Sequence, residues 1–78
     1  MSTIQIGKYK HYKDENKLYN VIGVARHSEN PEEEFVVYQA LYKGDFPEGQ
    51  IWIRPYKMFL EKIIVDGKTV PRFTYVGD

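Results

Sequence analysis

The chain has 78 residues, in which 11 Lys and Arg balance 11 Asp and Glu, and it contains no cysteine. These numbers exclude a second hydrophobic core, disulfide bonds, thiolate metal sites and cysteine nucleophiles, and a neutral chain is a poor candidate for phosphate-driven binding of nucleic acid. The first residues lack the features of a signal peptide, and no apolar run approaches the roughly 20 residues that span a bilayer, so we expect one cytoplasmic domain over 1–78 without membrane contact.

Short apolar runs between closely spaced turn signals predict an all-β chain. The runs are rich in Val, Ile, Tyr and Phe, and no helical period persists beyond about ten residues. We expect strands near 8–13, 17–27, 34–42, 50–54 and 61–65, a strand-like tail at 69–76 and a further candidate edge at 4–6. Asp66-Gly67 is typical of a tight hairpin turn, and Pro55 suits the start of a short helical turn over 55–60. This order predicts a small SH3-like antiparallel barrel of about five strands.

The loop lengths predict a register and an inner face for the barrel. A loop over 28–33 places Gly23 opposite Tyr38, and the following hairpin places Tyr38 beside Arg54. In this register a glycine lies under a large ring, which is a common way to fill a strand interior. The inner face is then predicted to carry Tyr9, Tyr19, Val21, Gly23, Ala25, Val36, Tyr38, Ala40, Tyr42 and Trp52.

The stretch His27-Ser28-Glu29 is the first candidate for chemistry. A serine nucleophile needs a base within hydrogen-bond reach and an oxyanion hole, but neighbouring residues on a strand point to opposite faces. The sequence also lacks a nucleophile elbow, so we expect no catalytic residue here. The alternative is a polar turn in which Ser28 bonds the backbone and His27 pairs with Glu34 across the hairpin.

Arg54 is the most informative polar residue. Side chains alternate between the two faces of a strand, and this alternation places Arg54 on the inner face near Tyr38. Such an arginine either anchors the helical turn or recognises a carboxylate, a phosphate or a peptide carbonyl. Arg72 could supply a second charge to that site. The two histidines, His11 and His27, are too far apart in the predicted hairpins to share a metal, so we expect neither a metal nor a cofactor.

Several motifs together resemble the small bacterial domain family DUF1653, a domain of unknown function. They are the segments GKYKHYK at 7–13, YNVIGVARHSE at 19–29, VYQALY at 37–42, WIRPYKMF at 52–59 and VPRF at 70–73. The resemblance covers about 7–73 and implies a bacterial SH3-like barrel, but no established activity or substrate. It also implies that the family's polar positions correspond here to His11, His27, Ser28, Glu29, Arg54 and Arg72.

We therefore favour a non-enzymatic binding module that holds a peptide, a protein segment or a small anionic ligand. Its candidate ligand-binding residues are His11, His27, Ser28, Glu29, Tyr38, Arg54 and Arg72. One alternative is weak nucleic-acid binding through the basic first hairpin, with Lys8, Lys10, Lys13, Lys17 and Tyr12. A second alternative is a small hydrolase-like enzyme that uses His27 as acid or base and Arg54 to stabilise charge.

Overall fold

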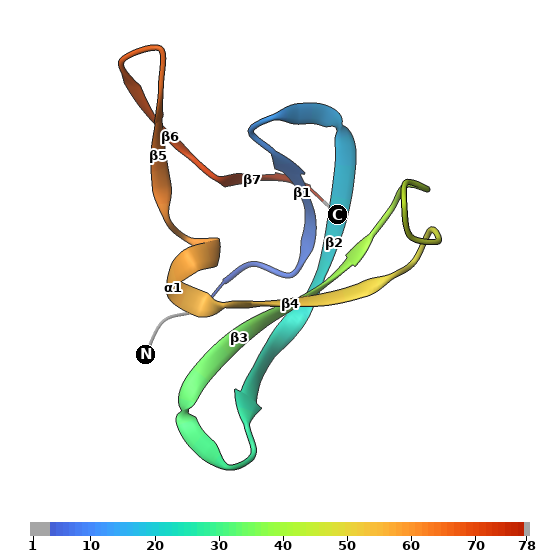
Figure 1. The fold of residues 1–78 in the computed structure, drawn as a ribbon, viewed down its shortest axis with the longest axis vertical. Helices are drawn as coiled ribbons and strands as arrows, with labels where there is room; N and C mark the ends of the chain where they lie inside the picture. Colours follow the sequence, from blue (N-terminus) through green and yellow to red (C-terminus); the bar gives the residue numbers. More distant parts are fainter. Residues whose placement is uncertain (1–3, 78) are drawn as a thin grey trace.

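The computed structural model describes residues 4–77, apart from the side chains of residues 14 and 15. Seven strands and one short helix account for most of these residues (Figure 1). The elements are β1 (Gly7–His11), β2 (Asp14–His27), β3 (Asn30–Ala40), β4 (Ile51–Pro55), α1 (Tyr56–Phe59), β5 (Lys62–Val65), β6 (Lys68–Pro71) and β7 (Phe73–Gly77). The predicted all-β class and the helical turn after Pro55 are confirmed. The candidate edge at 4–6 was wrong, because these residues precede β1 without strand structure.

The strands form an open, bent sheet rather than a closed barrel. Five antiparallel strands are hydrogen-bonded in the order β4-β3-β2-β1-β7, and β5 pairs only with β6. Within residues 4–77, β4 and β7 are therefore two unjoined edges. The predicted barrel does not close, because the chain leaves the sheet through α1 and the β5–β6 hairpin before it returns as β7 (Figure 1). No helix in this part of the chain is long and apolar enough to cross a membrane.

The helical turn closes one side of the core. Pro55 has φ −51°, which is the value its ring imposes, and it directly precedes the helix. Tyr56 and Phe59 are three positions apart, so both project from the same side of the turn and both are buried. The turn therefore holds two rings against the inner face of the sheet.

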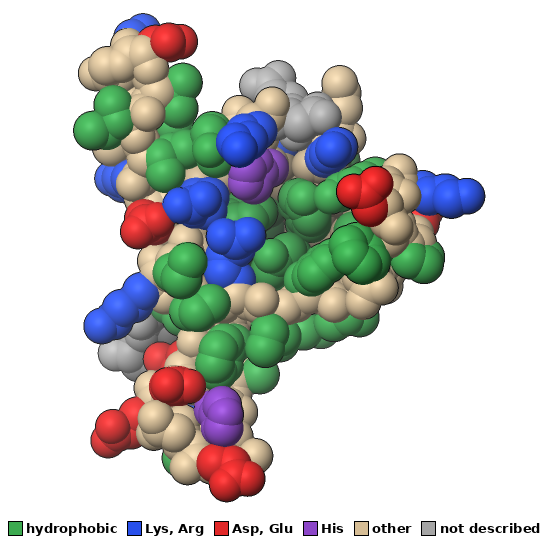
Figure 2. All heavy atoms as spheres, in the orientation of Figure 1, with side chains coloured by type: hydrophobic (Ala, Val, Ile, Leu, Met, Phe, Trp, Pro, Cys, Tyr) green, Lys and Arg blue, Asp and Glu red, His purple; other side chains and the backbone are tan. Residues whose placement is uncertain are grey.

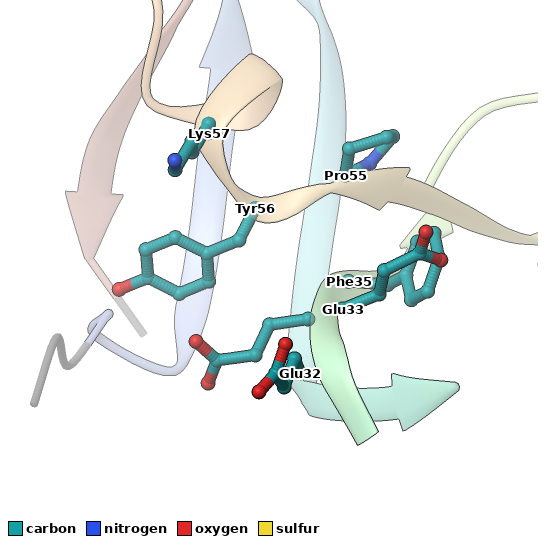
Figure 3. A pocket seen from close by; sticks show the side chains of 7 residues that line it. Glu32, Glu33, Phe35, Pro55, Tyr56 and Lys57 are labelled. Atoms are coloured by element: carbon teal, nitrogen blue, oxygen red, sulfur yellow. The ribbon is translucent and has the colours of Figure 1, made fainter. Parts of the chain in front are cut away.

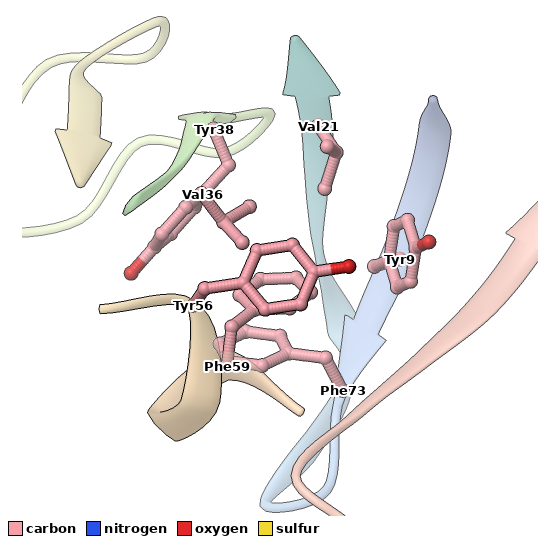
Figure 4. Packing of buried hydrophobic residues seen from close by; sticks show 7 residues of the cluster. All are labelled: Tyr9, Val21, Val36, Tyr38, Tyr56, Phe59 and Phe73. Atoms are coloured by element: carbon pink, nitrogen blue, oxygen red, sulfur yellow. The ribbon is translucent and has the colours of Figure 1, made fainter. Parts of the chain in front are cut away.

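Aromatic rings dominate the core. Phe59 is the largest fully buried side chain, at 2% exposure, and Val21 and Val36 belong to the same cluster at 0%. Partly buried Tyr19 and Trp52 pack against this cluster. Figure 4 shows the rings converging from the sheet, the helical turn and β7; the cluster consists of Tyr9, Val21, Val36, Tyr38, Tyr56, Phe59 and Phe73.

A β-bulge in β2 changes the predicted register. Val21 pairs with Tyr38, but the pairing shifts between Val21 and Gly23, so that Gly23 pairs with Val37. A Cβ atom at Gly23 would meet nothing within 4 Å, so Tyr38 does not lie over it as predicted. Because the extra residue reverses side-chain parity beyond it, Ala25 is exposed rather than internal. Tyr38 pairs with Trp52 and not with Arg54.

Candidate functional site

Two basic side chains from separate strands contact the ring of Phe73 at the start of β7, and a third, Arg72, acts electrostatically on one of them, His11. The His11 ring, from β1, contacts the Phe73 ring edge-on with centroids 5.1 Å apart. The Arg54 guanidinium, from β4, lies 5.5 Å from the Phe73 centroid. Arg72 immediately precedes Phe73 in the chain. We call His11, Arg54 and Arg72 the basic cluster.

Arg54 is held by its aromatic neighbours. Its Nε donates a hydrogen bond of 3.3 Å to the Tyr38 hydroxyl, and its guanidinium carbon faces Phe73. Arg54 and Tyr38 are therefore in contact, although they are not paired across the strands as the sequence predicted. Among the side chains that the structure describes, which leave out those of residues 14 and 15, no carboxylate forms a salt bridge with Arg54. The guanidinium thus keeps its charge and further N–H groups for another acceptor.

Arg72 is tied to the segment that follows α1. One of its terminal nitrogens lies 2.6 Å from a carboxylate oxygen of Glu61, and its backbone N–H donates to the Glu61 carbonyl. The carbonyl of Arg72 in turn accepts from the N–H of Tyr12. Its Nε is buried and has no hydrogen-bond partner in the part of the chain that the structure describes. Arg72 therefore joins the β1–β2 hairpin to the helical turn while one donor stays unsatisfied.

His11 is a neutral imidazole held in a positive environment. Its Nδ1 accepts a 3.1 Å hydrogen bond from the backbone N–H of Lys13, which places the ring proton on Nε2. Partial burial lowers the pKa of His11 below its ordinary value of 6.5, and the charges of Arg54 and Arg72 lower the pKa further. Lys13 and Lys17 act in the same direction. An anion placed here would reverse this effect and favour the imidazolium form.

A row of tyrosine rings continues from the basic cluster. Tyr19 contacts both Phe73 and Tyr42 edge-on, at centroid distances of 5.7 Å and 5.5 Å. The hydroxyls of Tyr19 and Tyr42 are 2.8 Å apart and share a hydrogen bond. Burial raises the pKa of Tyr19, this hydrogen bond raises it further, and Arg54 acts against both. Arg54 is therefore close enough to the Tyr19 hydroxyl to influence its ionisation.

This row ends at a hollow of about 330 Å³, which we call the aromatic hollow. Trp52 and Phe46 meet there edge-on at 5.0 Å, and the Lys17 ammonium lies 5.3 Å from the centroid of Tyr42. Figure 2 shows hydrophobic side chains beside a group of Lys, Arg and His side chains on one face of the molecule. The lining residues are Lys17, Ala40, Tyr42, Gly44, Asp45, Phe46, Pro47 and Trp52.

The other predicted site residues, His27, Ser28 and Glu29, lie at the tip of the β2–β3 hairpin. All three are exposed, and the backbone N–H of Glu29 donates a 3.1 Å hydrogen bond to Nδ1 of His27. The strand partner of His27 is Asn30, and the predicted partner Glu34 instead pairs with Arg26 at 3.5 Å. In Figure 2 one histidine adjoins basic side chains and the other lies far from it, among acidic ones. The predicted set is therefore divided between two places.

The family model described as "Protein of unknown function (DUF1653)" matches residues 7–75. The chain belongs to this family. The crystal structure of a DUF1653 protein from Bordetella bronchiseptica is similar to it, with a TM-score of 0.78 and 33% sequence identity. The similarity covers 95% of this chain and 88% of that chain. No curated protein matches the chain.

This DUF1653 domain has two further hollows, one away from the basic cluster and one beside it. The hollow of about 390 Å³ in Figure 3 is lined by Glu32, Glu33 and Glu34 together with Phe35, Pro55, Tyr56 and Lys57. Three carboxylates make this hollow unsuitable for an anion. A hollow of about 440 Å³ between the first hairpin and the β5–β6 hairpin is partly lined by His11.

The side chains that the structure describes, without those of residues 14 and 15, include no group of three or more His, Asp or Glu that could hold a metal ion.

Proposed function

We propose that this DUF1653 domain is a non-enzymatic module that binds a small anionic ligand at the basic cluster. The observation that carries the proposal is Arg54: a half-buried guanidinium on an aromatic surface with no carboxylate partner among the described residues. A planar guanidinium is well suited to phosphate or carboxylate, because it offers two parallel N–H donors.

The neighbouring groups support an anion rather than a cation. His11 accepts a proton more readily when an anion is near, so binding would add a third positive charge to those of Arg54 and Arg72. Phe73 and Tyr19 form an apolar floor, which lowers the local dielectric and strengthens such contacts. The residues at the hairpin tip contribute nothing to this site, and no contact favours an enzyme that uses His27 with Arg54.

The proposal is tested by NMR titration of the domain with inorganic phosphate. Amide and side-chain signals of His11, Arg54 and Phe73 should shift together, and the pKa of His11 should rise when phosphate is bound. Arg54→Gln should abolish these shifts. Arg26→Gln is a matched control, since Arg26 is an exposed arginine of the hairpin tip.

Shifts that are scattered over the surface, or that survive in Arg54→Gln, would refute an anion site at this position. The circular dichroism spectrum and melting temperature of each variant show whether the fold is retained, so that loss of binding is not confused with loss of structure.

A further inference from the structure

The aromatic hollow and the basic cluster are adjacent. Trp52 and Arg54 are two positions apart on β4, so they project from the same face of the strand, roughly 7 Å from each other along it. Both side chains are half-buried. A ligand that reaches Arg54 therefore has the indole of Trp52 as its neighbour.

The tyrosine row provides a second, independent connection. Tyr42 lines the hollow, and its hydroxyl is bonded to that of Tyr19, which in turn contacts Phe73 beneath Arg54. Lys17 lines the hollow as well and also acts electrostatically on His11. A chain of side-chain contacts thus links the basic cluster to the hollow, and Lys17 places a positive charge at the hollow.

The hollow itself is suited to a flat ring with polar edges. Trp52 and Phe46 meet at an interplanar angle of 86°, so a ring stacked on one of them contacts the other edge-on. Asp45 and the Lys17 ammonium also line the hollow and offer an acceptor and donors to the edge of such a ring. Asp45 also disfavours an anion in the hollow, so the charged end of a ligand would lie at Arg54.

We infer that the ligand of the proposed site is a nucleoside phosphate, with its phosphate at His11, Arg54 and Arg72 and its base in the aromatic hollow. The spacing of Trp52 and Arg54 is comparable to the separation that a ribose imposes between a 5′-phosphate and its base. Base stacking on aromatic side chains contributes about 1–3 kcal/mol per base, so the base should add about 5- to 150-fold to the affinity for phosphate alone. This inference rests on the proposed function, because it names the ligand class of the same site.

The test compares four probes on the intact domain: inorganic phosphate, ribose 5-phosphate, adenosine and adenosine 5′-monophosphate. Trp52 is the only tryptophan, so its fluorescence reports on the hollow directly. The nucleotide should quench Trp52 and bind at least fivefold more tightly than ribose 5-phosphate. Phosphate and ribose 5-phosphate should shift the His11 signals but change the Trp52 emission far less than the nucleotide does, because neither stacks a base on the indole.

Two variants separate the base from the phosphate. Phe46 is 54% exposed, so Phe46→Ala should leave the fold intact and remove most of the gain from the base while phosphate affinity is kept. Arg54→Gln should remove the phosphate contribution and leave the weak quenching by adenosine. Ser28→Ala at the hairpin tip serves as the control that changes neither.

The two proposals fail in different ways. If phosphate shifts His11 but the nucleotide binds no more tightly and does not quench Trp52, the anion site stands and the nucleotide inference is wrong. If no probe shifts His11, both are wrong. A 5′-phosphorylated dinucleotide that binds as tightly as the mononucleotide would identify the end of an oligonucleotide as the source, and a mononucleotide preference would identify a free nucleotide.

Discussion

The rings of Phe59 and Phe73 stack face to face, with centroids 4.3 Å apart and planes only 4° from parallel. Phe59 comes from the helical turn and Phe73 from the first position of β7, so this stack joins the two parts of the chain that flank the β5–β6 hairpin. The Phe73 ring also contacts the guanidinium of Arg54 and the ring of His11. The core and the basic cluster thus share one ring.

Phe59→Ala is expected to destabilise the domain by about 3–5 kcal/mol, because it removes a fully buried ring and leaves a cavity. In a domain of this size such a loss approaches the whole stability. Urea denaturation followed by circular dichroism measures the change. Phe46→Ala is the matched control, with an expected cost of about 1 kcal/mol or less because Phe46 is largely exposed. Equal losses for the two variants would contradict the assignment of the core.

Alanine substitutions at Gly67 and Gly23 can be compared directly, because the space around the two glycines is similar and their backbone angles differ. A Cβ atom at either position would meet nothing within 4 Å, but Gly67 has φ +78° in the β5–β6 turn. Gly67→Ala should therefore cost about 1–2 kcal/mol, since an L side chain is strained in the left-handed region. Gly23→Ala should be neutral or stabilising by up to about 1 kcal/mol, because the unfolded chain loses freedom. Thermal melts of both variants test this, and a clash at Gly23 would show as a loss.

Stability should depend on pH through His11. The pKa of folded His11 lies below 6.5, so the unfolded chain binds the proton more tightly. The contribution of neutral His11 is complete above pH 6.5 and is lost as the pH falls below 6.5 through the folded pKa. Urea unfolding between pH 5 and pH 8 measures the free energy of unfolding of two variants, His27→Gln and the His11→Gln/His27→Gln double variant. His27 is replaced in both, so the two differ only at His11. The free energy should fall with decreasing pH in His27→Gln and fall less in the double variant. Identical pH profiles would mean that His11 is not perturbed. The range of this experiment, pH 5 to pH 8, extends about 1.5 units below and above the ordinary pKa of histidine.

Glu61→Gln should strengthen phosphate binding. Glu61 neutralises Arg72 at 2.6 Å, and the carboxylate is half-exposed, so its removal costs only about 0.2–1 kcal/mol of stability. Without this partner Arg72 should raise phosphate affinity by roughly 1.4- to fivefold, which is the same free energy of about 0.2–1 kcal/mol converted to a ratio of dissociation constants. Calorimetric titration measures the change. Glu29→Gln at the hairpin tip removes the same charge elsewhere and should leave the affinity unaltered.

Much of the fold follows from residue types that act locally. Asp66-Gly67 predicts the β5–β6 turn, and both residues have positive φ there. Pro55 predicts the start of the helical turn. Tyr38 and Trp52 were placed on the inner face, and the structure has them paired with one buried and the other half-buried.

The bulge at Ile22 could not be predicted from the pattern of side chains. Residues 21–25 are all non-polar, so the sequence shows no break in alternation there, and the extra residue shows only in the pairing between β2 and β3. For the same reason the exposure of Ala25 and the open space at Gly23 were missed. Closure of the sheet depends on where β7 pairs, which no local signal determines.

The candidate site shows a similar limit. The family resemblance named His11, Arg54 and Arg72, but also the three residues of the hairpin tip. Chain separation alone does not reveal that His11 and Arg54 share the ring of Phe73, whereas His27 lies elsewhere. The aromatic hollow was visible in the sequence only as a set of inward-facing rings, because the loop that carries Phe46 has no regular pattern.

The bulge in β2 has a dynamic consequence for the hairpin beyond it. The residues from Val24 to Glu33 are exposed and contribute nothing to the buried cluster, whereas Val21 and Tyr38 are part of it. Segments with few buried contacts open locally at a lower free energy than the core. Amide hydrogen exchange should therefore be fast throughout this arm and slow at Val21, and a dye or a short insertion at the tip should leave the remainder of the domain undisturbed.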